Sequence, residues 1–175
     1  MKADITEFHD LVTALLDDYG SCTDLNFENA TRRGVIEFVK FLGESFKSGS
    51  LCDYEGNQVT DIHAVLKTLI EEGGHAFLEG GQSPLKRIQV DVFYDPEVDR
   101  LAEVELSFFP EDFFEIDTLR DEFLAWLQLV QRKLQSPKSY LRFEDGSWTF
   151  GDTSRDSGVI LVHRLNEVEF GSGEV

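Results

Sequence analysis

Apolar and polar side chains alternate along two neighbouring stretches in the middle of the chain, 88–94 and 102–108. A period of two residues is typical of a β-strand that buries one face. The segment between them, 95–99, contains Asp, Pro and Glu and has the composition of a turn. The pattern predicts an antiparallel strand pair whose valine and leucine side chains face the core.

A helical repeat follows the second stretch. From Leu119 to Leu134 apolar residues recur at spacings of three and four, which predicts one long amphipathic helix. Arg132 and Lys133 in its last turn suit the negative end of the helix dipole, and Pro137 prevents continuation. Phenylalanines crowd the corner between strand and helix, at positions 108, 109, 113 and 114.

The front of the chain shows helical spacing. Apolar stripes predict helices over 5–19, over about 27–46 and over 62–70. Thr60 or Asp61 is the expected N-cap of the third helix, which the glycine pair at 73 and 74 should end. We therefore expect a helical N-terminal part.

The segments around these helices have weaker signals. Residues 21–26 have the polar composition of a loop, 51–54 could form a short strand, and 75–79 fits neither period clearly. After the long helix, apolar stretches predict strands at 140–143, 148–150 and 159–165.

Together these elements predict an α+β fold in which three N-terminal helices precede an antiparallel sheet with one long helix packed on it. The length favours a single domain, 1–175. The strongest linker signal is Gly80-Gly81-Gln82-Ser83-Pro84. We place there a possible division into a helical part, 1–79, and a sheet-plus-helix part, 85–170.

The charge of the chain is unusual. Thirty-four acidic residues face sixteen Lys and Arg, which gives a formal net charge of −18. Such a field opposes binding to nucleic acid and to anionic membranes, because each approach to a phosphate is repulsive. It favours a basic protein partner, although acidity also serves solubility alone.

Residues that often carry catalysis are present without the spacing that catalysis needs. The four histidines form no HxH or HExxH pair, and no phosphate-binding glycine loop or Gly-x-Ser-x-Gly motif occurs. Cys22 and Cys52 lie outside any CxxC motif, and we expect buried or idle thiols rather than a disulfide bond. We expect no enzyme activity, no cofactor and no metal ion.

Nothing in the sequence indicates a membrane or an export route. No apolar run follows the first four residues, and no stretch approaches 18 apolar residues. We therefore expect a cytoplasmic protein.

The strand pair offers a candidate binding surface. If its valines face the core, Asp91, Glu103 and Glu105 share the other face, with Phe93 and Phe109 on the same side. Like charges on adjacent strands are mildly destabilising, and aromatic anchors among charges have the composition of an interface. A merely solvated face, or one covered by the long helix, is the alternative. Glu111 and Asp112 also suit a helix entrance. The candidate partner-binding residues are Asp91, Phe93, Glu103, Glu105, Phe109, Glu111 and Asp112.

In size, acidity and lack of catalytic groups, the chain resembles the small acidic immunity proteins that bacteria make against polymorphic or contact-delivered toxins. The resemblance implies one-to-one inhibition in the cytoplasm, by blocking the basic cleft of a nuclease-like toxin. A DNA mimic of the phage anti-defence type and a non-catalytic adaptor subunit are alternatives. Interspersed bases count against mimicry: Arg32, Arg33, Lys86, Arg87, Arg132 and Lys133.

Overall fold

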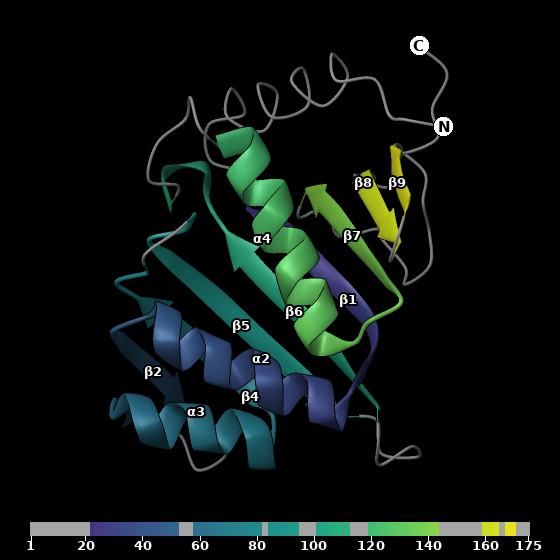
Figure 1. Ribbon diagram of the computed structural model, residues 1–175. Helices are drawn as coiled ribbons and strands as arrows, with labels where there is room; N and C mark the ends of the chain where they lie inside the picture. The colour runs from purple at the N-terminus through teal and green to yellow at the C-terminus, as the bar shows by residue number, and fades with distance from the viewer. Residues whose placement is uncertain are drawn as a thin grey trace.

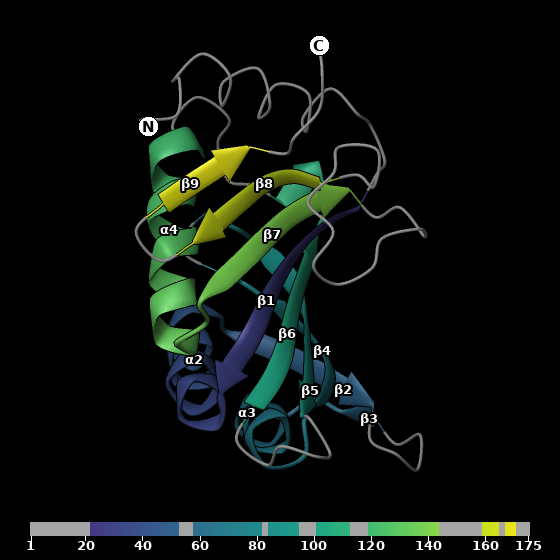
Figure 2. The same cartoon turned by 90° about the vertical axis from the view of Figure 1, so that its right-hand side faces the viewer.

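The chain folds as one antiparallel sheet with helices packed on one of its faces (Figures 1 and 2). The computed structural model describes residues 22–52, 58–81, 84–94, 101–112, 119–143, 159–164 and 167–170. The described strands are β1 (Thr23–Thr31), β2 (Ser48–Cys52), β3 (Gln58–Val59), β4 (Gly74–Glu79), β5 (Arg87–Tyr94), β6 (Leu101–Phe108), β7 (Lys138–Phe143), β8 (Val159–Arg164) and β9 (Glu167–Phe170).

These nine described strands are ordered β3-β2-β4-β5-β6-β1-β7-β8-β9. The described helices are α2 (Arg32–Ser45), α3 (Ile62–Glu71) and α4 (Leu119–Leu134), and a short 3-10 turn, η1 (Pro110–Asp112), follows β6. Figure 2 shows α2 and α4 on one side of the sheet. α3 packs beside α2 and against the helix-covered face of β2 and β4.

The predicted strand pair and long helix are confirmed. β5 and β6 pair so that Val90 lies opposite Leu106 and Val92 opposite Val104, and all four side chains are buried on the helix side. α4 spans the predicted residues and buries one stripe of its surface. Its Phe123 ring meets the Phe108 ring of β6 edge to face, with centroids 5.9 Å apart.

α2 and α4 approach each other closely at Gly34. The N-cap Thr31 accepts a hydrogen bond from the Gly34 amide at 2.9 Å, which starts α2 there. A Cβ atom on residue 34 would lie 2.0 Å from the Leu134 carbonyl oxygen at the end of α4. Glycine lowers the helix propensity at this position, but its lack of a side chain permits the contact between the two helices.

The prediction that the N-terminal part is helical is wrong, because the first described element is a strand. Residues 21–26 were expected to form a loop and residue 27 to begin a helix, but β1 spans Thr23–Thr31 and lies between β6 and β7 near the middle of the sheet. Leu25 and Phe27 face the helices, whereas Asp24 and Asn26 face the other side and are also buried. The sequence did not predict this strand, because the buried polar residues Asp24 and Asn26 give it the composition of a loop.

The other front segments also join the sheet. Asp61 is the N-cap of α3, as one of the two predicted alternatives, and Gly73 follows the helix with φ +79°. Residues 75–79, which fitted neither period clearly, belong to β4, and β4 pairs with β5. The segment 80–84 thus connects two neighbouring strands of one sheet.

Several predicted elements lie outside the described residues: the helix over 5–19, the turn at 95–99 and the strand at 148–150. The strands predicted at 140–143 and 159–165 correspond to β7 and β8.

Candidate partner-binding face

The side of the sheet opposite the helices is the outer face. Side chains alternate along each strand, so those that flank a core residue on β1, β4, β5, β6 or β7 point to this side. The pairing registers fix its central side chains: Asp24, Asn26, His75, Phe77, Gln89, Asp91, Phe93, Glu103, Glu105, Ser107, Tyr140 and Arg142.

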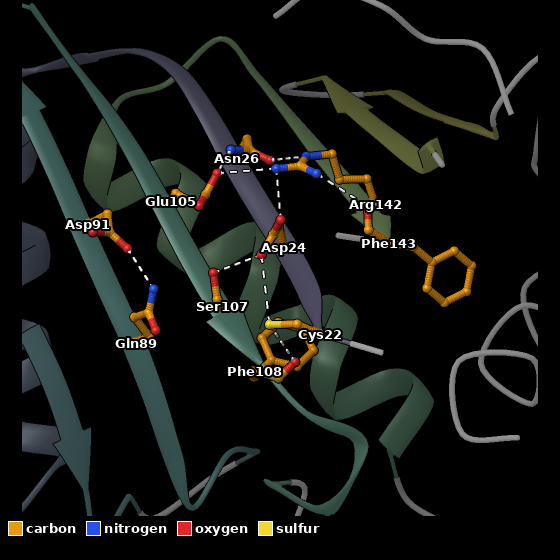
Figure 3. A network of polar contacts seen from close by, with 10 residues as sticks. All are labelled: Cys22, Asp24, Asn26, Gln89, Asp91, Glu105, Ser107, Phe108, Arg142 and Phe143. Carbon is orange, nitrogen blue, oxygen red and sulfur yellow. Dashed lines mark hydrogen bonds and ion pairs between the residues drawn. The ribbon is translucent and has the colours of Figure 1, made fainter. Parts of the chain in front are cut away.

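Arg142 on β7 is the centre of a polar network on this face (Figure 3). Its Nη2 atom lies 2.7 Å from Asp24 Oδ2 and 3.4 Å from Glu105 Oε2. Its Nε atom donates to Asn26 Oδ1 at 3.0 Å. Two carboxylates thus share one guanidinium across β1, β6 and β7.

The remaining polar atoms of the network are also paired. Ser107 Oγ donates to Asp24 Oδ1 at 2.7 Å, and the Asn26 amide donates to Glu105. Asp24 and Arg142 are buried, and Glu105 is partly exposed. Buried ions are tolerated when they are paired and hydrogen-bonded, so this network holds three strands together.

Asp91 points to the outer face, as the alternation predicted, but it is not exposed there. Its carboxylate is buried, because His75 Nδ1 lies 2.6 Å from Oδ1 and Gln89 Nε2 donates to Oδ2 at 3.1 Å. Asp91 lies opposite both His75 on β4 and Glu105 on β6. At this position the group exposed to solvent is therefore the imidazole of His75, which is half exposed.

Aromatic rings protrude from the same region. Phe77 on β4 is 50% exposed and Phe93 on β5 is 58% exposed, and Phe109 after β6 is 38% exposed. Phe93 lies opposite the exposed Glu103, as the predicted pairing required. Phe77 and Phe93 lie on either side of the His75–Asp91 pair, and exposed aromatic side chains among charges are typical of interaction sites.

Sequence reasoning missed Phe77 and His75. Their signal is the alternation of β4, where Ala76 and Leu78 are buried and His75, Phe77 and Glu79 are exposed. The strand is six residues long and follows a helix directly, so the pattern is short.

Glu111 and Asp112 lie at η1, beyond the end of β6, and differ in role. The buried Asp112 accepts a hydrogen bond from Arg87 Nε, and its Oδ2 accepts one from the Phe109 amide at 2.9 Å. Asp112 therefore fixes the turn at the end of β6. Glu111 is exposed, 3.9 Å from Arg87 Nη2.

The two halves of the outer face differ in charge. Among the described side chains, the half over β4, β5 and β6 has four carboxylates, from Glu79, Asp91, Glu103 and Glu105, and one base, Arg87. The half over β1, β7 and β8 has the acids Asp24 and Glu28 and the bases Lys138, Arg142 and Arg164. The acidic surplus thus coincides with the exposed rings.

Two titratable side chains are buried near β7. The Tyr140 hydroxyl donates to Glu28, and burial together with this carboxylate raises the pKa of Tyr140 well above its usual value. His163 contacts Gln131 of α4 on the helix side, where burial lowers the pKa of the imidazole. Both groups are enclosed and have structural roles.

Within the described ranges, no group of three or more His, Cys, Asp or Glu side chains is arranged to hold a metal ion. No helix among these residues is long and apolar enough to cross a membrane.

No protein-family model matches the sequence, and no curated protein matches it. The fold is similar to that of a chain in the crystal structure of the toxic C-terminal tip of CdiA from Pseudomonas aeruginosa in complex with immune protein. The TM-score is 0.51 at 14% sequence identity, and the match covers 83% of this chain and 96% of that one. This chain therefore has the fold of a protein found in a toxin–immunity complex.

Proposed function

We propose that this chain is a bacterial immunity protein that binds a basic, nuclease-like toxin in the cytoplasm and blocks it without any turnover. The observation that carries the proposal is the acidic half of the outer face, where exposed phenylalanines lie among carboxylates. The likeness in fold to a chain of the CdiA toxin complex supports it.

Charge favours the inhibitor over the toxin as the role of this chain. A net charge of −18 repels phosphates, so it opposes the substrate of a nuclease. The same charge attracts a basic cleft that has evolved to hold nucleic acid, and it raises the rate of encounter. An inhibitor that must act before its toxin reaches a substrate benefits from this rate.

The seven residues predicted from sequence divide into contacts and supports in this proposal. Phe93, Glu103, Phe109 and Glu111 are exposed and make the contacts with the toxin. The other three, Asp91, Glu105 and Asp112, position the neighbouring side chains of His75, Arg142 and Arg87.

Where a large exported protein is encoded directly upstream of this chain, its C-terminal tip can be used to test neutralisation. The tip is expressed in bacteria with and without this chain, and growth is followed. We expect growth arrest by the tip alone and recovery with the chain. A tip that neither binds the purified chain nor is neutralised by it contradicts the proposal.

The surface can be tested with two charge-reversal triples of equal net change. Glu79, Glu103 and Glu111 are exposed on or beside the outer face, and each is changed to Lys. We expect the association rate to fall by roughly tenfold or more, with a weaker salt dependence, because steering charges act over about one Debye length.

The control triple changes exposed helix-side acids to Lys, at Glu37, Glu44 and Glu72. It shifts the net charge equally and should slow association by about threefold or less, since these charges lie farther from the contact. Equal effects of both triples would show that only total charge matters and that the chosen face is wrong.

A further inference from the structure

Phe77 and Phe93 lie on either side of an ionisable pair on the outer face. His75 on β4 faces Asp91 on β5, with Phe77 two residues along β4 and Phe93 two residues along β5. The His75 and Phe77 rings meet edge to face, with centroids 4.9 Å apart. The arginine patch is defined as Phe77, His75, Asp91, Phe93 and Glu103.

Among the described residues, the arginines on the outer face beside the patch contact acids outside it. Arg87 on β5 binds Asp112 and lies near Glu111, beyond the end of β6. Arg142 on β7 is held by Asp24, Glu105 and Asn26. Neither arginine lies over the rings of Phe77 or Phe93.

Other aromatic rings of this chain are covered by the chain's own cations. The Arg32 guanidinium lies 4.6 Å from the Tyr94 ring centroid, and Lys138 Nζ lies 4.5 Å from that of Tyr140. Within the part of the chain that the structure describes, no cation lies over Phe77 or Phe93. These two rings combine exposed faces with neighbouring carboxylates, which suits a cation from another molecule.

We propose that the arginine patch is the docking site for arginine side chains of the basic protein partner. The inference rests on the proposed function, since that partner is the toxin. A guanidinium lies flat on an aromatic ring while its N–H groups donate to carboxylates, and it is less strongly hydrated than an ammonium group. The patch offers both kinds of contact side by side.

His75 adds a third contact. The Asp91 carboxylate can only accept a hydrogen bond, so the Nδ1 atom that faces it carries the proton. In the neutral ring Nε2 is then an acceptor, and the side chain is half exposed. A guanidinium N–H on Phe77 can donate to it.

Other occupants fit this surface less well. A second copy of the chain would bring one net charge of −18 against another. A nucleic acid would be repelled in the same way. A basic protein surface is the macromolecule that the charges favour.

Peptides of six arginines or six lysines are the probes, titrated into the full chain by calorimetry and by NMR of labelled phenylalanine rings. We expect hexa-arginine to bind severalfold more tightly than hexa-lysine and to shift the signals of Phe77 and Phe93. The double variant F77A/F93A should bind hexa-arginine about tenfold more weakly, near the level of hexa-lysine. The control, Phe41→Ala, removes a ring on α2 that Lys133 already covers, on the side of the sheet opposite the patch, and should change the affinity by less than about twofold.

Unchanged affinity of the double variant for hexa-arginine, with a far-ultraviolet spectrum like that of the parent, would overturn the inference. The same holds if the parent neutralises the toxin tip and the double variant neutralises it equally well, in which case the proposed function stands. If hexa-arginine binds at the two rings but the tip is not neutralised, the proposed function fails and the arginine site stands.

Discussion

The two halves of the outer face contain similar residue types and use them differently. Over β1, β7 and β8, acids meet bases and the Tyr140 ring is buried with Val159 and Val162. Over β4, β5 and β6, acids outnumber bases and the rings of Phe77 and Phe93 are exposed. In the first half the acids and bases are paired within the fold, and the second half exposes both charge and apolar surface.

Arg142→Met should have the largest effect and tests the first half. It leaves the buried carboxylate of Asp24 without its counter-ion, so we expect a loss of about 3–5 kcal/mol in the free energy of unfolding, measured with urea. Arg33→Met, at an exposed position on α2, should change it by less than about 0.5 kcal/mol. A small loss at Arg142 would mean that the two halves do not differ in this way.

Tyr140→Phe should have an intermediate effect. It removes the hydroxyl that donates to Glu28, and we expect a loss of about 1 kcal/mol near neutral pH.

The same residue gives a pH signature. The pKa of Tyr140 is raised by burial, so the folded state keeps this proton more tightly than the unfolded state. Its stabilising contribution is full below the unfolded pKa of about 10 and is lost as the pH rises above it. Urea unfolding at pH 9 and pH 11 should show a smaller decline for Tyr140→Phe than for the parent. Equal declines would show that the hydroxyl is accessible to base.

Phe93→Ala should have the smallest effect on stability, although it contributes to a contact in the proposals above. More than half of the side chain is exposed, so we expect a change of less than about 0.5 kcal/mol in urea unfolding. Phe27→Ala, at a fully buried position of β1, should cost about 3–5 kcal/mol and is the matched comparison. A large loss at Phe93 would assign this ring to the core.

Sequence periodicity predicted the parts of the fold that pair locally. The β5–β6 strand pair and α4 each show a regular pattern within their own residues, and both were found. β1 was missed, because Asp24 and Asn26 are buried by Arg142, which lies 116 residues after Asn26. A periodic pattern within one strand cannot reveal a contact between residues so far apart in the sequence.

The candidate surface was predicted in part for the same reason. The alternation on β5 and β6 placed Glu103 and Phe93 side by side, as the register has them. It could not reveal that His75 and Gln89 bury the Asp91 carboxylate, since His75 reaches it from another strand. Phe77 lies on that same strand, β4, which the sequence did not predict.

The position of β1 determines how much of the chain must be synthesised before the sheet can be completed. Its hydroxyl partner on β6, Ser107, comes 83 residues after Asp24, and the guanidinium that neutralises Asp24 comes later still. A strand whose neighbours on both sides are made long afterwards cannot complete the sheet while the ribosome is still producing them. The nascent chain therefore has to wait for residue 142 before its central strand is held on both edges, and truncation before that point should leave a polypeptide that chaperones retain.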